Sequence, residues 1–268
     1  MIANARMYSV NAETAAAWHA LLEWVIARAG VAATVIDYPA PQPLTALWAR
    51  DDLAGAFMCG HPLSQATPRP IVLAAPIPAM PRCAGAPVYW TDIVVRADSA
   101  ITTIEDTFGK RFGYTTPDSQ SGYQALRYLL APYAKARGGR LFSATVGPLV
   151  TPRRVIEAVL AGDCDAGPVD SYALELFRST EPDFVSPLRV IASTAITPIP
   201  ALIASSTIDS ESCERLADAF RNAGDADELA DARGKLRLTG FARPAAADYD
   251  VLRLRAREAD QLGYSQLA

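Results

Sequence analysis

The chain has 268 residues, of which 50% are hydrophobic and 20% charged, and its formal net charge is −4. This is enough apolar material for a well-buried core in one large domain or two small ones. The acidic balance and the lack of a Lys- or Arg-rich run argue against a nucleic-acid groove or a polybasic membrane patch. Small molecules and other proteins are the partners left to consider.

Cysteine and histidine are too scattered for a metal site. No CxxC pair occurs, and the chain has only two histidines, so we expect neither a metal nor a cofactor. Free, buried thiols are expected, and a single disulfide in an oxidising compartment stays an open alternative. The cysteines are Cys59, Cys83, Cys164 and Cys213.

The first residues, MIANARMYSVNAETAAAW, show no charged segment followed by an apolar one, as a secretion signal would. No stretch approaches the roughly 18 apolar residues of a membrane span. We therefore expect a soluble chain. Whether a signal was removed before residue 1 stays open.

Helices and short apolar strands alternate along the chain. Apolar residues recur at helical spacing over 13–29 and stop at Gly30, and the apolar segment 31–38 reads as a strand that ends before Pro39. Further strands are predicted at 54–59, 70–76, 88–96, 111–115, 165–169 and 188–194, and helices at 121–136, 152–161, 170–178, 210–222 and 246–261.

This alternation predicts an α/β protein with mixed, mainly parallel sheets flanked by helices. The strands 88–96 and 188–194 each lead from one block of α/β units into the next, so we interpret them as crossovers between two lobes. Residues 1–91 and 194–268 then form a discontinuous first lobe, and residues 92–193 form the second. A ligand cleft is expected between the lobes.

A serine-rich turn opens the helix predicted at 121–136. Asp118, Ser119 and Ser121 offer capping oxygens, Gly122 allows close backbone approach, and the helix continues from Tyr123. Unpaired N–H groups and the positive end of the helix dipole suit an anion such as phosphate, phosphonate or carboxylate. The alternative is an ordinary helix cap that holds no ligand.

A second polar residue ends a predicted strand. The strand at 165–169 leads directly to Asp170, and open α/β sheets place ligand contacts at the carboxyl ends of their strands. Asp170 also suits the N-cap of the helix predicted to follow. Ligand contact and cap are both open, because one carboxylate can do both.

Three ordered motifs resemble a known family. The segments YWTDIVVRADSAITTIEDTFGKRFGYTTPDSQSGY, RRVIEAVLAGDCDAGPVD and RVIASTAITPIPALIAS are similar to the substrate-binding proteins of phosphate, phosphite and phosphonate ABC transporters, over roughly residues 54–205. The resemblance implies a two-lobed type II periplasmic-binding-protein fold joined by two crossover strands, and a receptor rather than an enzyme. It also implies a small anionic ligand, a membrane permease as partner and a periplasmic location. We expect a monomer.

In this family the serine-glycine turn grips the anion, a tyrosine near the first crossover lines the cleft, and the acidic residue after the "VD" strand meets any amine. Two departures leave the ligand open: SQSG replaces Ser-Thr-Ser-Gly, and GPL replaces a Gly-x-His that usually donates to the ligand. The ligand-binding residues implied are Tyr89, Ser119, Gln120, Ser121, Gly122 and Asp170, and we also expect Tyr123 to contact the ligand.

First-lobe loops supply further candidates. Tyr8 in MYSV and His61 in CGHPL are expected near the cleft, although a histidine in such a loop is commonly satisfied by neighbouring groups. Cys59 and His61 form no convincing nucleophile pair, because no orienting acid is evident. The runner-up function is a non-secreted sensor or thiamine-precursor-like (pyrimidine) binder of the same fold, which leaves a cytoplasmic location open.

Overall fold

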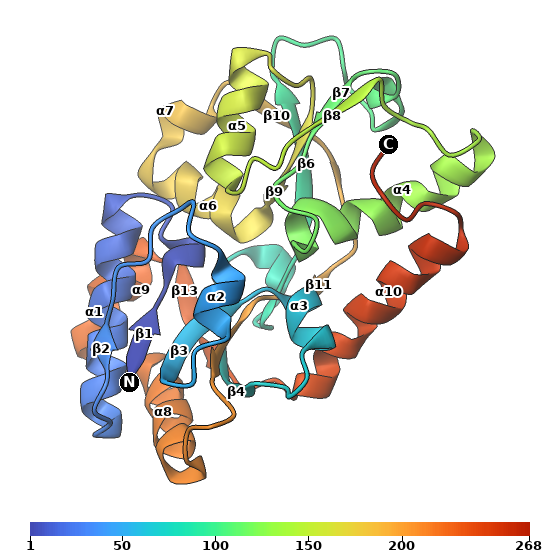
Figure 1. The fold of residues 1–268 in the computed structure, drawn as a ribbon. Coiled ribbons are helices and arrows are strands. Elements are labelled where there is room, and N and C mark those ends of the chain that lie inside the picture. The colour runs from blue at the N-terminus through green and yellow to red at the C-terminus, as the bar shows by residue number, and fades with distance from the viewer. The chain divides into compact units, whose positions relative to one another are not determined.

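The computed structural model describes residues 1–268, and internal contacts divide the chain into two compact units (Figure 1). The first unit comprises Met1–Val88 and Pro198–Tyr249, and the second comprises Tyr89–Thr197 and Asp250–Ala268. Short strands β5 (Val88–Tyr89) and β11 (Thr197–Pro198) contain two of the passages of chain from one unit to the other.

The first unit is built on a six-stranded sheet of order β13-β4-β12-β3-β1-β2. β1 is parallel to β2 and β3, whereas β12 is antiparallel to β3 and β4, and β13 is antiparallel to β4. The predicted α/β class is confirmed, but the expectation of mainly parallel pairing is wrong. The chain returns from the second unit into β12, which inserts between β3 and β4 in the opposite direction. The strands are β1 (Ile2–Asn4), β2 (Thr34–Val35), β3 (Leu53–Met58), β4 (Ile71–Pro78), β12 (Ala201–Ala204) and β13 (Leu238–Ala242).

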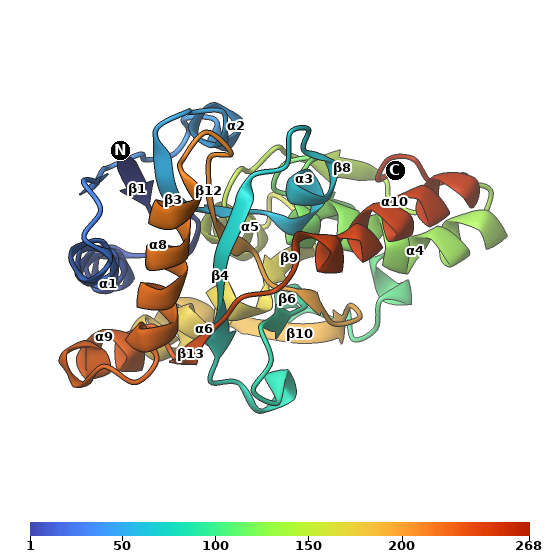
Figure 2. The same cartoon turned by 90° about the horizontal axis from the view of Figure 1, so that it is seen from below.

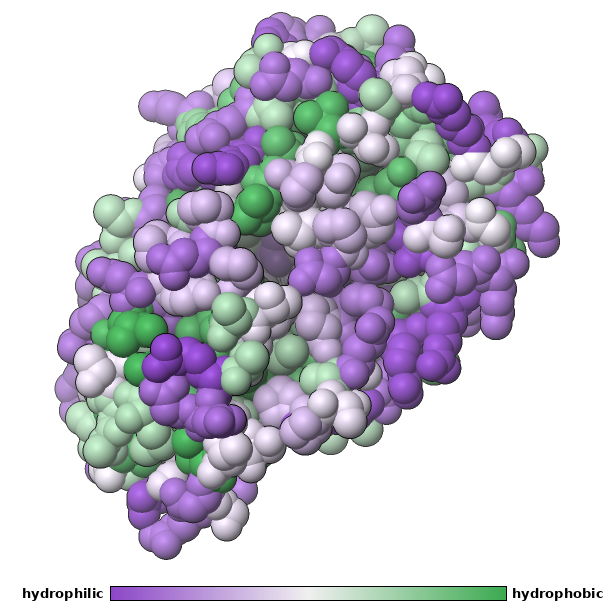
Figure 3. All heavy atoms as spheres, in the orientation of Figure 1, coloured by the Kyte–Doolittle hydropathy of each residue, from purple (hydrophilic) through white to green (hydrophobic).

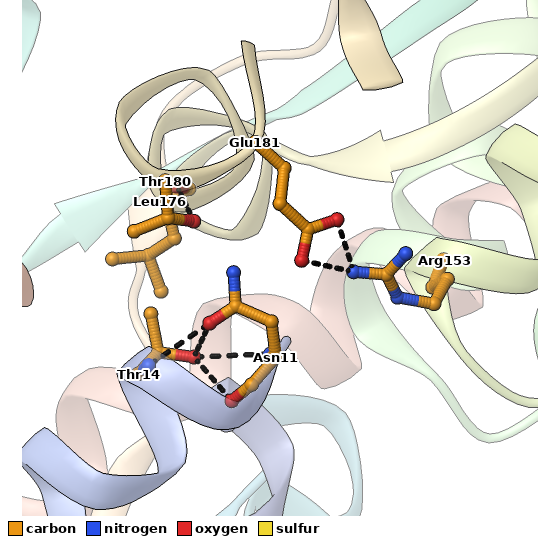
Figure 4. A network of polar contacts seen from close by, with 6 residues as sticks. All are labelled: Asn11, Thr14, Arg153, Leu176, Thr180 and Glu181. Atoms are coloured by element: carbon orange, nitrogen blue, oxygen red, sulfur yellow. Dashed lines mark hydrogen bonds and ion pairs between the residues drawn. The ribbon is translucent and has the colours of Figure 1, made fainter. Parts of the chain in front are cut away.

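Helix α1 (Ala12–Ala29) shows how local sequence defines an element of this unit. Asn11 and Thr14 form a capping box at its start, with each side chain accepting from the other residue's amide at 2.9 and 3.1 Å (Figure 4). Gly30 ends it in the left-handed region at φ 62°. Trp18 packs edge-on against Phe57 of β3, with 4.9 Å between ring centroids. The other helices of the unit are α2 (Leu44–Trp48), α3 (Gly60–Gln65), α8 (Ser210–Ala223) and α9 (Ala230–Lys235).

The second unit contains an antiparallel sheet of order β10-β6-β9 and a parallel pair β7-β8. Arg153 binds both carboxylate oxygens of Glu181, at 2.8 and 2.6 Å (Figure 4), and so ties α5 to the end of α6. No helix of the chain is both long and apolar enough for a membrane crossing. The elements are β6 (Thr91–Arg96), β7 (Arg111–Gly113), β8 (Ala144–Val146), β9 (Gly167–Asp170), β10 (Leu188–Ser193), α4 (Ala125–Ala136), α5 (Pro152–Ala161), α6 (Ser171–Thr180), α7 (Pro182–Val185) and α10 (Asp250–Gln261).

The C-terminal segment corrects the expected lobe boundaries. Residues 250–268 were assigned to the first lobe, but they belong to the second unit. The reason is packing, since Ala259, Tyr264 and Leu267 lie in the same hydrophobic cluster as residues of α4. Both cartoon views place α10 beside α4 (Figures 1 and 2), and its outward surface is hydrophilic (Figure 3).

The expected buried thiols are confirmed, because all four cysteines are buried and none forms a disulfide. Burial raises the pKa of Cys83 to about 11 and that of Cys164 to about 12. At pH 8 these two thiols are therefore protonated as well as inaccessible. We expect the native protein to resist a thiol-specific reagent. The denatured protein should react with four equivalents of that reagent, one for each cysteine. Rapid modification of the native protein would contradict this packing.

Candidate ligand-binding site

The serine-rich turn lies at the start of α4, as predicted. Ser119 is the N-cap, and its Oγ accepts from the amide of Gly122 at 3.0 Å. The amide of Gln124 donates to the carbonyl of Ser119 at 2.9 Å. Instead of an α-helix from residue 121, the chain first forms a π-helical turn, η4 (Gln120–Gln124). Single π-helical turns are frequent at functional sites.

The turn is suited to an anion. The Ser119 hydroxyl accepts one hydrogen bond from the backbone, so its own proton is available to a further acceptor. Ser121 is half-buried and Gln120 is buried beside it. First-turn amides point away from the helix body, and the helix dipole adds positive potential there. Ser119 therefore both caps the helix and presents a donor.

Gly122 is required by a close contact with Thr115. A Cβ on Gly122 would lie 1.8 Å from Oγ1 of Thr115. Thr115 is only 5% exposed, and its hydroxyl has no hydrogen-bond partner in the structure. Glycine here permits close approach between the turn and Thr115, whereas close approach of the turn to a ligand stays a prediction. Its partner Thr115 could not be inferred from the sequence, because a single threonine after a strand carries no signal.

Asp170 is the N-cap of α6. Its Oδ1 accepts from the amides of Tyr172 at 2.9 Å and Ala173 at 3.0 Å, and the residue is 7% exposed. The capping interpretation is thus confirmed. Contact between Asp170 and a ligand stays a prediction.

Thr91 connects the turn to the strand end that carries Asp170. It faces Asp170 in the β6–β9 pairing, and its Oγ1 donates to the carbonyl of Ser121 at 2.9 Å. Its own amide donates to Oγ1 of Thr194 at 3.0 Å. Sequence reasoning missed Thr91, although adjacent polar residues at the start of a largely apolar strand are a usable signal.

Three aromatic residues of the second unit, among them the candidates Tyr89 and Tyr123, differ in role. Tyr89 is buried in β5. Trp90 is anchored by its indole N–H, which donates to Asp92 at 2.8 Å. The hydroxyl of Tyr123 accepts from the amide of Leu267 at 3.1 Å, and its ring lies in the hydrophobic core. We therefore assign Tyr123 to the core and leave it out of the proposed ligand contacts.

Tyr8 and His61 lie in segments that follow β1 and β3 of the first unit. These strands are parallel neighbours, so their carboxyl ends share the sheet edge where α/β proteins place ligand contacts. Tyr8 is buried edge-on against Phe57, at 5.0 Å between ring centroids. Nε2 of His61, on α3, lies 2.8 Å from Nε2 of Gln65.

Arg6 is a cation at the same edge that sequence reasoning missed. It lies two residues after the end of β1 and donates through Nη1 to the carbonyl of Gln42. Its guanidinium lies 5.7 Å from the centre of the Tyr38 ring. Burial lowers the pKa of Arg6, which nevertheless stays protonated. The edge therefore carries a fixed positive charge.

Comparison with known proteins identifies relatives of the whole chain. A family model described as "ABC transporter, phosphonate, periplasmic substrate-binding protein" matches residues 8–249. A binding protein component of an ABC phosphonate transporter from Pseudomonas aeruginosa has a TM-score of 0.81 at 20% identity, covering 98% of this chain and 87% of that one. PhnD1 from Prochlorococcus marinus in complex with methylphosphonate has a TM-score of 0.78 at 16% identity, covering 97% and 98% of the two chains. No curated protein sequence matches.

The structural neighbours confirm the mixed α/β, two-lobed type II periplasmic-binding-protein fold. The family consists of receptors that bind a small molecule and work with a membrane permease, and not of enzymes. Since the family model spans nearly the whole chain, this protein belongs to the phosphonate-binding family of periplasmic substrate-binding proteins of ABC transporters.

Proposed function

We propose that this protein is the solute-binding receptor of an ABC-type uptake system and binds a small phosphonate- or phosphate-like anion. The observation that carries the proposal is the Ser119-capped turn at the start of α4, which Thr91 holds beside the strand end of Asp170. The methylphosphonate bound by the neighbour from Prochlorococcus marinus supports this ligand class.

The residues have different tasks in this proposal. Ser119, Gln120 and Ser121 hold the anionic group, and Gly122 lets the backbone approach it. The carboxylate of Asp170 binds the amine of an aminoalkylphosphonate, as a charge-assisted hydrogen bond allows. Tyr89, Tyr8 and His61 are further proposed ligand contacts. Uptake from the periplasm through a permease is part of the same proposal.

A thermal-shift screen tests the ligand class. The compounds are phosphate, phosphite, methylphosphonate, 2-aminoethylphosphonate, small carboxylates and pyrimidines, with sulfate at equal ionic strength as the control. A ligand at 100 times its Kd stabilises the native state by about 2.7 kcal/mol, which corresponds to a rise in Tm of roughly 5–10 °C. We expect this for at least one phosphonate or phosphate. A response to pyrimidines or carboxylates alone contradicts the proposed ligand, and no response contradicts the receptor proposal.

A further inference from the structure

A buried arginine lies directly behind the proposed anion-binding turn. Arg127 of α4 is 4% exposed, and each of the three nitrogens of its guanidinium donates a hydrogen bond. Nη1 donates to Oε1 of Gln124 at 2.6 Å, Nε donates to the carbonyl of Tyr264 at 3.1 Å, and Nη2 forms an ion pair with Asp260. One side chain thus joins η4 to the C-terminal segment.

Gln124 passes this connection on to the turn. Its Nε2 donates to the carbonyl of Pro117 at 2.6 Å, and its backbone amide donates to the carbonyl of Ser119 at 2.9 Å. A guanidinium has only donors, so Arg127 must face the oxygen of the Gln124 amide. This fixes the amide orientation and directs the NH₂ group at Pro117. The turn is therefore held on both sides of its capping serine.

The C-terminal segment is itself well anchored. The amide of Leu267 donates to the hydroxyl of Tyr123 at 3.1 Å. The terminal oxygen of Ala268 accepts from the amides of Leu141 and Phe142, at 2.7 and 3.2 Å. Figures 1 and 2 show α10, which carries Asp260, running beside α4. The far end of the Arg127 network is consequently fixed by the core of the second unit.

We infer that Arg127 is a positioning residue for ligand binding: held by Asp260 and Tyr264, it fixes Gln124 and thereby the geometry of the Ser119–Gln124 turn. The inference rests on the proposed function of that turn. Because Asp260 neutralises the guanidinium, the effect is geometric rather than a direct attraction for the anion. A preorganised turn binds more tightly, since ordering it upon binding costs affinity.

The test compares Arg127→Gln with Arg189→Gln. Arg189 is a matched control in the same unit, because its guanidinium also makes three hydrogen bonds, here to the backbone carbonyls of Ala97, Ser99 and Ile101, but none to a residue of the turn. In the ligand-free protein we expect Arg127→Gln to accelerate hydrogen exchange at the Gly122 and Gln124 amides about tenfold or more. Arg189→Gln lowers Tm and leaves these amides unchanged.

Affinity for methylphosphonate gives the second readout, by titration calorimetry. Arg127→Gln is expected to raise Kd about 10-fold or more. This ratio of Kd values should change little with salt concentration, because the effect of Arg127 is geometric. Arg127→Lys recovers part of the loss, because an ammonium can reach Gln124 or Asp260 but cannot make all three bonds. If wild type does not bind methylphosphonate, the titration uses a phosphonate or phosphate that raised Tm in the screen. If none of them binds, the proposed ligand class fails, while the exchange experiment still tests the positioning role.

Two outcomes would overturn the inference. One is a folded Arg127→Gln variant with wild-type exchange at Gly122 and Gln124. The other concerns a second variant, Asp260→Asn, which is used if Arg127→Gln does not fold. Asp260→Asn is a mild change, because the Asp260 side chain is 52% exposed. Asp260→Asn is expected to accelerate exchange at the same amides several-fold, and unchanged rates refute the role of the C-terminal segment.

Discussion

Replacing Gly122 with alanine is expected to lower the free energy of unfolding by about 1–3 kcal/mol and to weaken methylphosphonate binding by an order of magnitude or more. The new Cβ would lie 1.8 Å from Oγ1 and 2.8 Å from Cβ of Thr115. Rotating the threonine side chain moves Oγ1 but leaves its Cβ in place. The turn backbone must therefore shift, which displaces Ser119 and Ser121 from the geometry proposed to hold the anion.

Gly234→Ala is the matched control for this change. Gly234 lies in α9, and a Cβ there would meet no atom within 4 Å. Alanine is the better helix former by up to about 1 kcal/mol, so this variant should be as stable as wild type or more so, with unchanged affinity. Adding Thr115→Ala to Gly122→Ala should recover part of the stability, because Oγ1 and Cγ2 are removed. Denaturant unfolding and calorimetry measure both effects, and a Gly122→Ala variant with wild-type stability and affinity contradicts the argument.

Asp170→Ala and Asp170→Asn are expected to differ in stability. Alanine leaves the amides of Tyr172 and Ala173 without their acceptor. Loss of such a cap typically costs about 1 kcal/mol. Asparagine caps helices as well as aspartate does, so Asp170→Asn should unfold within a few tenths of a kcal/mol of wild type. Thermal and denaturant unfolding of the ligand-free variants check this difference.

The asparagine variant then isolates the charge of Asp170. If the carboxylate binds a ligand amine, Asp170→Asn should weaken 2-aminoethylphosphonate binding about 10- to 100-fold and change methylphosphonate binding little. Calorimetry with both ligands measures the ratio directly. Equal weakening of the two ligands would point to an altered turn, and unchanged affinities would leave Asp170 with its capping role alone.

Many helices and strands, and both helix caps of the proposed site, were predictable, because the residues that define them are close together in the sequence. The capping box at Asn11 and the C-terminal Gly30 bound α1. Ser119 and Asp170 were expected to cap helices, and both do so. The resemblance of three motifs also pointed to the family that the whole-chain comparison establishes.

The contacts that shape the site were not predictable, because they join residues distant in sequence. Thr91 meets the carbonyl of Ser121, and Arg127 meets Asp260 on a helix more than 100 residues away. Tyr123 illustrates the consequence. It was among the expected ligand contacts, yet its hydroxyl accepts a hydrogen bond from the amide of Leu267.

Sequence by itself determined the α/β class and the capped turns, since apolar periodicity and capping act locally. Only the tertiary structure decided the antiparallel insertion of β12, the membership of residues 250–268 in the second unit, and the close contact of Gly122 with Thr115. The sequence of an amphipathic helix or an apolar strand indicates that one face is buried, but not which hydrophobic core that face packs against. That choice depends on the free energy of packing the whole chain.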